Sequence, residues 1–192
     1  MNEHSGDPAF PILLLGDSNP KNGQNRLKMR LDPRHPARHN IWTPVIDETP
    51  DIIYKKGKKR VNTSTICTRN ALQEPSNKPS PNDVQWNDAI EKRIREFAWK
   101  VQLHLPIVLI SFGLSSVEFA HRAQGEPTKR NLKYWGAEHL GDEFWSKIGS
   151  FSVNAVNVIS LLHVSIARGH FVESHESFSS SSGIITSGIL QN

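Results

Sequence analysis

Short apolar runs punctuate the chain and mark its expected strands. They cover residues 11–15, 64–68, 106–112 and 153–162. These runs are rich in branched side chains and do not alternate between apolar and polar positions, which is typical of strands covered on both faces. The pattern therefore predicts four buried strands of a parallel sheet.

Helical spacing of apolar positions appears between these runs. Residues 83–104 repeat apolar side chains every three or four positions, after a loop rich in Pro, Asn and Ser. Residues 114–123 and 136–149 show patterns of the same kind. The sequence therefore predicts helices over these three segments.

Strands and helices alternate along the chain, which is the signature of an open parallel sheet with right-handed crossovers. We expect a single-domain, three-layer α/β/α fold with a central, mainly parallel four-stranded sheet over residues 10–173. A flexible, polar N-terminus (1–9) should precede it, and a disordered Ser-rich tail (174–192) should follow it. In such sheets ligands bind at the carboxyl ends of the strands.

Charge and cysteine content narrow the function classes. The chain has 192 residues and a formal net charge of +4, which suits a polyanionic partner. Its one cysteine, Cys67, excludes a disulfide framework, a Cys-based zinc site and an iron–sulfur cluster within one chain. The chain shows neither a signal-peptide pattern nor a bilayer-length apolar stretch, so we expect a cytoplasmic monomer without a membrane partner.

The first strand is expected to end in a loop of turn-forming residues, Gly16-Asp17-Ser18-Asn19-Pro20. Gly16 allows a sharp turn and the close approach of a ligand. Asp17 or Asn19 could hold a water, and Ser18 could donate a hydrogen bond or act as a nucleophile. The same composition is that of an ordinary turn, but its place at a strand end favours a functional role.

Polar groups also follow two other strands. Asn70 comes after the second strand, where its amide could read the edge of a base or simply form a turn. His163 comes after the fourth strand, with Ser165, Arg168 and Gly169 next along the chain. An imidazole there can donate a hydrogen bond to a departing anion and Arg168 suits a phosphate, although a lone histidine is more often structural.

The segment after the first strand is basic and aromatic. Arg38 and Trp42 could contact a phosphate and stack on a base, or could belong to a solvated loop with Trp42 packed on the core. His35 and His39 have the spacing of metal ligands on a helix, but a proline lies between them. We therefore expect no metal site and no cofactor.

In their order along the chain, these motifs resemble the uracil-DNA glycosylase superfamily. That family begins with an apolar strand and a loop of Gly, an acid or Asn, and Pro, to which Gly16–Pro20 is similar. Asn70 within 68–72, the strand Pro106–Gly113 and the loop 163–169 are similar to later family motifs, so that the resemblance covers roughly residues 10–172. Here the first loop is longer, no Pro follows His163, and a Ser-rich tail replaces a further helix.

This resemblance implies a DNA-base glycosylase that hydrolyses the N-glycosidic bond of a flipped-out uracil or other deaminated base. Asp17 or Asn19 would orient the water, and His163 would stabilise the departing base. The implied base-binding residues are Gly16, Ser18, Pro20, Asn70 and Trp42. The implied DNA contacts come from Ser165, Arg168, Gly169, Arg38 and Lys21.

Two other functions fit the same residues. Gly16-Asp17-Ser18 after an apolar strand also looks like the nucleophile block of the GDSL-type serine esterases. That family carries an Asp-x-x-His pair near its C-terminus, whereas here the only such pair is Asp32–His35. The other alternative is a non-catalytic nucleic-acid-binding relative, which would bind DNA in a salt-dependent way without turnover.

Overall fold

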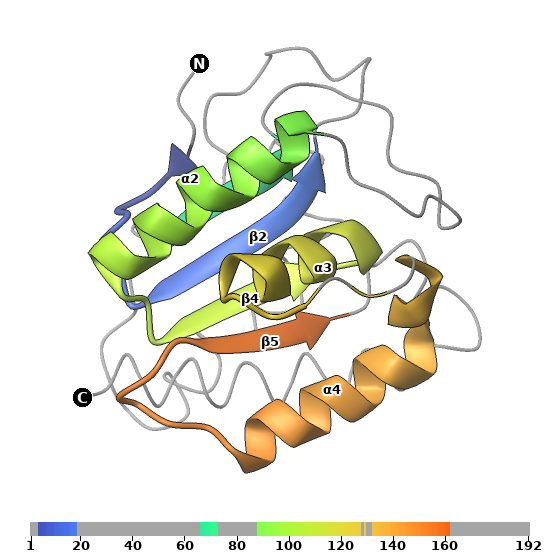
Figure 1. Cartoon of the computed structure of the whole chain (residues 1–192). Coiled ribbons are helices and arrows are strands. Elements are labelled where there is room, and N and C mark those ends of the chain that lie inside the picture. Colours follow the sequence, from blue (N-terminus) through green and yellow to red (C-terminus); the bar gives the residue numbers. More distant parts are fainter. Residues whose placement is uncertain (1–3, 19–65, 73–87, 128, 130–131, 162–192) are drawn as a thin grey trace, which may run out of the picture.

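A mainly parallel sheet forms the centre of the protein (Figure 1). The computed structural model describes residues 4–18, 66–72, 88–127, 129 and 132–161. Its strands are β1 (His4–Ser5), β2 (Ile12–Ser18), β3 (Cys67–Leu72), β4 (Val108–Phe112) and β5 (Asn157–Leu161). Its helices are α2 (Asp88–His104), α3 (Leu114–Ala123), the 3-10 helix η3 (Leu132–Trp135) and α4 (Ala137–Gly149).

The strand order in the sheet is β1-β3-β2-β4-β5. Strands β2 to β5 run parallel to one another, and β1 pairs antiparallel with β3. The prediction of an α/β fold with four parallel strands is therefore confirmed. The fifth strand was not expected, because His4 and Ser5 are polar and lie in the segment assigned to a flexible N-terminus.

Apolar side chains enter two separate clusters, which explains why the strands lack an alternating pattern. Leu13 and Leu15 of β2 belong to one cluster with Phe97 of α2 and residues of α3. Ile12 and Leu14 belong to the other, together with side chains of η3 and α4. Because successive side chains of a strand point to opposite faces, both faces of β2 are covered.

Helix α2 ends where its apolar repeat predicts. Phe97 and Val101 are buried one turn apart, and the helix stops at His104. Leu105 then takes the left-handed conformation, with φ of 46°, and its N–H donates to the carbonyl of Val101 at 2.8 Å. Pro106 follows, so this is a left-handed cap closed by a residue that cannot continue a helix.

Two strands run further than their apolar runs predict, and these expectations are corrected. Strand β2 continues through Gly16, Asp17 and Ser18, which were expected in a loop. Strand β3 continues to Leu72, so that Asn70 lies within it and does not follow it. The reason is pairing: Gly16 lies opposite Asn70 and Ser18 opposite Leu72, and this ladder satisfies backbone groups regardless of turn propensity.

Candidate functional site

The topology singles out the carboxyl ends of β2 and β4. From β2 the chain passes to β3 on one side of it, and then returns to β4 on the other side. Such a reversal of direction opens a crevice beyond the strand ends, and ligands bind there in open parallel sheets. Asp17 at the end of β2 and Gly113 after β4 flank this position.

Asp17 is a buried carboxylate, only 9% exposed. Its Oδ1 accepts a hydrogen bond of 2.9 Å from the backbone N–H of Ser116, the third residue of α3. The N-cap of α3 is Gly113, which offers no side-chain cap. Asp17 therefore supplies from a neighbouring strand the acceptor that the helix lacks, and its negative charge suits the positive end of the helix dipole.

The turn from β4 into α3 depends on Gly113. Its φ of 87° is in a region that L-residues rarely adopt. Its N–H donates to the carbonyl of Leu161 at 2.9 Å, which ties the end of β4 to the end of β5. Its carbonyl accepts from the N–H of Val117 at 3.0 Å, and the Ser116 hydroxyl donates to the same carbonyl at 3.1 Å. This turn therefore holds α3, and with it the bond to Asp17, in one place.

Asn70 points away from Asp17. On β3, the guanidinium of Arg69 lies 5.0 Å from the ring centre of Phe97 in α2. Since side chains alternate along a strand, Asn70 faces the opposite side of the sheet. Asp17 shares its face of β2 with Leu15, which packs in the α2 and α3 cluster. The structure therefore places these two predicted site residues in neighbouring strands but on opposite faces.

Of the other predicted site residues, two lie in β2 and the rest lie outside the described segments. Gly16 is buried in β2, and Ser18 is its last residue, paired with Leu72 of β3. The rest lie outside the described residues: Asn19, Pro20, Lys21, Arg38, Trp42, His163, Ser165, Arg168 and Gly169.

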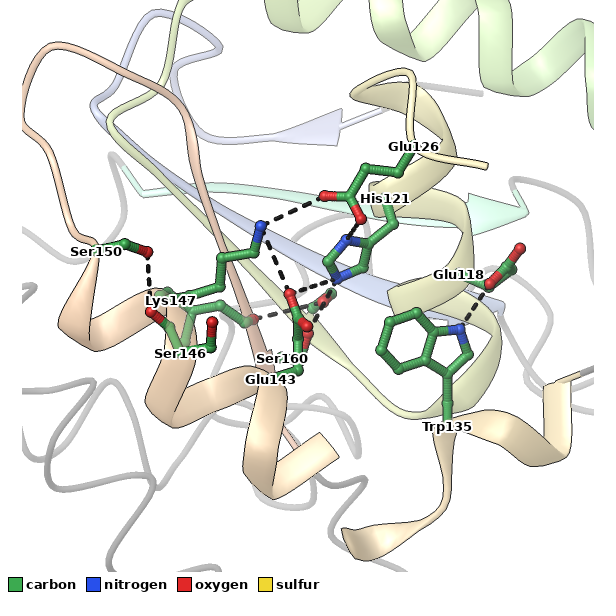
Figure 2. A network of polar contacts seen from close by, with 11 residues as sticks. Glu118, His121, Glu126, Trp135, Glu143, Ser146, Lys147, Ser150 and Ser160 are labelled. Carbon is green, nitrogen blue, oxygen red and sulfur yellow. Dashed lines mark hydrogen bonds and ion pairs between the residues drawn. The ribbon is translucent and has the colours of Figure 1, made fainter. Parts of the chain in front are cut away.

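A second polar cluster surrounds His121 on α3 (Figure 2). Its Nδ1 lies 2.9 Å from Oε2 of Glu126, and its Nε2 lies 3.7 Å from Oε1 of Glu143. Despite this short distance, Nδ1 makes no well-aligned hydrogen bond. The ring also stacks on Trp135, with centres 4.9 Å apart. His121 is only 1% exposed, so this imidazole is enclosed by its partners.

Lys147 of α4 joins the two carboxylates of this cluster. Its Nζ lies 3.4 Å from Oε1 of Glu126 and 3.5 Å from Oε1 of Glu143. Burial alone would raise the pKa of Glu126, but its contacts with His121 and Lys147 outweigh burial and lower that pKa. Glu126 therefore stays a carboxylate at neutral pH.

Glu118, one turn before His121, is buried and fully engaged. The indole N–H of Trp135 donates to its Oε2 at 2.6 Å, and the backbone N–H of Lys129 donates to its Oε1 at 3.2 Å. A buried carboxylate is tolerated when both oxygens accept hydrogen bonds. Glu118 thus ties the backbone of Lys129 and the indole of Trp135 to α3.

The His121 cluster includes the atoms of a hydroxyl–imidazole–carboxylate relay. The hydroxyl of Ser160 lies 3.5 Å from Nε2 of His121, whose Nδ1 faces Glu126. However, Ser160 is 0% exposed within β5, so a substrate does not reach it. The arrangement instead fastens α4 and β5 to α3, and it is a structural cluster that the sequence patterns did not reveal.

Metal and membrane features were also sought in the described segments. No group of three or more His, Cys, Asp or Glu side chains is placed there to hold a metal ion. None of the helices in these segments is both long enough and apolar enough to cross a bilayer.

A scan against protein-family models finds no matching family, and a search of curated proteins finds no similar sequence.

Proposed function

We propose that the protein is a DNA-base glycosylase-like hydrolase that cleaves the N-glycosidic bond of a flipped-out uracil or other deaminated base. The observation that carries this proposal is the buried carboxylate of Asp17 at the topological switch point of the sheet. Because β2, β3, β4 and β5 are parallel, their carboxyl ends lie at the same end of the sheet, which supports a shared site there.

In this mechanism Asp17 orients the attacking water and favours the positive charge that develops on the sugar. A water-positioning carboxylate must itself be held, and the bond from the Ser116 N–H supplies that restraint. His163 stabilises the departing base through a hydrogen bond. It follows β5 by two residues in sequence, and the end of β5 is tied to the turn at Gly113.

The remaining roles are assigned with the same proposal. Asn19 is the alternative to Asp17 for the water-positioning role, and Gly16, Ser18, Pro20 and Trp42 surround the base. Asn70 is left out of the base pocket, because it lies within β3 and faces the side of the sheet opposite to Asp17. DNA contacts come from Ser165, Arg168, Gly169, Arg38 and Lys21, in line with the net charge of +4.

The wider parts of the proposal concern the domain and its setting. A single three-layer α/β/α domain is supported by apolar clusters that pack on both sides of β2. The domain includes β1 as well as residues 10–173, and it acts as a monomer in the cytoplasm. Neither a metal nor a cofactor takes part in the proposed reaction.

An oligonucleotide cleavage assay tests this function on DNA that contains uracil, hypoxanthine or a mismatch. The variants are Asp17→Asn and His163→Ala. Asparagine is chosen at position 17 because its amide oxygen can still accept the hydrogen bond from the Ser116 N–H. We expect each to lower the rate by about 100-fold or more. Asp142→Asn is the matched control, since this exposed carboxylate lies on α4 and should leave the rate unchanged.

Other results of these experiments would favour one of the two alternative functions or contradict the proposal. Salt-dependent DNA binding without cleavage would indicate the non-catalytic relative. Hydrolysis of a nitrophenyl ester that disappears in Ser18→Ala would indicate the esterase. If the protein neither cleaves damaged DNA nor binds it, the proposed function is wrong.

A further inference from the structure

A small basic pocket lies at the opposite edge of the sheet from Asp17. It has a volume of about 70 Å³ and opens between the last turn of α2 and the starts of β2 and β3. The C-terminal end of α2 and the beginning of β2 lie at the same end of the sheet in Figure 1. Four of its lining residues are basic, none is acidic, and the rest are apolar apart from Cys67. The basic residues are His4, Arg69, Lys100 and His104.

Two independent features of the fold bring these basic side chains together. His4 and Arg69 are partners in the antiparallel pair of β1 and β3, and directly opposed residues share one face of a sheet. Lys100 and His104 are one turn apart on α2, so they lie on the same side of that helix. Arg69 is only 4% exposed, and its guanidinium packs over the ring of Phe97. Arg69 is therefore fixed within the fold, whereas His4, Lys100 and His104 are half-buried around it.

We propose that this pocket binds a small tetrahedral oxyanion, either free phosphate or the phosphate group of a small phosphomonoester. Its volume corresponds to roughly five water-sized spheres, at about 10–15 Å³ each, and a tetrahedral oxyanion has five heavy atoms. It is far below the roughly 300–1,000 Å³ of pockets that enclose drug-sized ligands, so it suits a small group. The planar fork of a guanidinium matches two oxygens of a phosphate, and the apolar walls strengthen the attraction.

Some charges near the pocket favour a bound anion, and others oppose it. Burial lowers the pKa of Arg69, whereas its interactions with Cys67 and Glu96 act against that shift. Glu96 does not line the pocket, and it also lies 3.9 Å from Lys92. The negative end of the α2 dipole opposes an anion, and it offers a simpler role for Lys100 and His104 as stabilisers of the helix end. If Lys100 and His104 only stabilise the helix end, an added oxyanion does not bind to the pocket. If they hold an anion, it does.

Titration calorimetry on the full chain tests the proposal, with inorganic phosphate, sulfate and phenyl phosphate at an ionic strength matched with chloride. Lys100→Ala should weaken binding by about tenfold, because a charged hydrogen-bond donor is lost. Lys92→Ala is the control on the same helix, since its side chain is 74% exposed and does not line the pocket. Lys100 is preferred to Arg69 for the variant because replacing a buried guanidinium can prevent folding.

The choice of ligands distinguishes the source of the anion. Binding of phenyl phosphate as well as phosphate identifies a phosphomonoester ligand, and binding of the inorganic ions alone identifies a free oxyanion. Binding that chloride reproduces, or that Lys100→Ala and Lys92→Ala weaken equally, overturns the proposal.

Discussion

The side chain of Asp17 has two roles, one structural and one in the proposed reaction. As the acceptor for the Ser116 N–H it holds the first turn of α3, and as the proposed water-positioning group it must present a negative charge. The first role needs an oxygen atom, whereas the second needs a carboxylate. Replacements that change one property and keep the other therefore separate fold from chemistry at this position.

The stability of two Asp17 variants tests the first role. Asp17→Ala should lower the free energy of unfolding by about 1–2 kcal/mol, because the Ser116 N–H loses its acceptor in a buried place. Asp17→Asn should cost less than Asp17→Ala, because its amide oxygen can still accept that bond. Urea denaturation measures both values. Equal losses in the two variants would show that the charge, and not the hydrogen bond, holds the helix.

Gly113 tests the turn that positions α3. Gly113→Ala should cost about 1–3 kcal/mol of unfolding free energy, because its φ of 87° strains any residue with a Cβ. Gly149→Ala is the matched control, since a Cβ added there has no heavy atom within 4 Å and the residue ends α4. The control should be neutral or slightly stabilising. Similar losses in both variants would contradict a special role for the Gly113 backbone.

At the level of elements, the sequence predicts the bounds of the helices better than it predicts the ends of the strands. The predicted helix at 114–123 has the bounds of α3, and α2 ends at His104 as predicted. Helical repeats are local, so a short segment contains the information. The continuation of β2 through Gly16–Ser18 depends on pairing with β3, which is distant in sequence, and local turn propensity therefore gave the wrong boundary.

The His121 cluster was not predictable for a similar reason. Glu118 and His121 share a helix face, but Glu143 and Ser160 come from α4 and β5. No fixed spacing links elements that meet only after folding. The one local signal is a Glu and a His one turn apart on the same helix, and it does not identify the partners of either side chain.

The lowered pKa of Glu126 gives this cluster a dependence on pH. Its pKa lies below the ordinary value of 4.5, so the folded state binds this proton less tightly than the unfolded chain does. The stabilisation is therefore complete above about pH 4.5 and is lost as the pH falls through the folded-state pKa. The side chain is 35% exposed, so solvent screening keeps the effect modest.

Glu126→Gln should therefore lower the urea midpoint at neutral pH, and the difference from the wild type should shrink as the pH falls below the usual titration range of a Glu. Urea curves of the wild type and the variant across that range measure the difference. Asp142→Asn, on the exposed side of α4, is the control and should not reproduce the pattern. A deficit of Glu126→Gln that stays constant with pH would contradict an ionic contribution.

At the level of the molecule, the two ends of the parallel strands carry different groups. Asp17 lies near the carboxyl ends of the strands, and the basic pocket around Arg69 lies at their amino ends. The sequence predicted that Asp17 lies near the end of the first strand, although the strand itself continues to Ser18. It did not predict the pocket or the face of Asn70, since both depend on strand register, and a shift of one residue reverses every side chain.

The short strand β1 links the edge of the sheet to the basic pocket. It covers the outer edge of β3, where His4 pairs with Arg69. Uncovered strand edges present unpaired N–H and C=O groups that recruit other chains. Removing residues 2–6 should therefore increase self-association, measured by light scattering, and should also weaken phosphate binding in calorimetry because His4 is lost.

His4→Ala separates these two effects. It keeps the backbone pairing of β1, so it should remain as free of association as the wild type while binding phosphate more weakly. If His4→Ala associates as strongly as the truncated chain, the side chain and not the backbone protects the edge. If the truncated chain binds phosphate as tightly as the wild type, β1 closes the sheet without contributing to the pocket, and the anion is held by Arg69 and α2 alone.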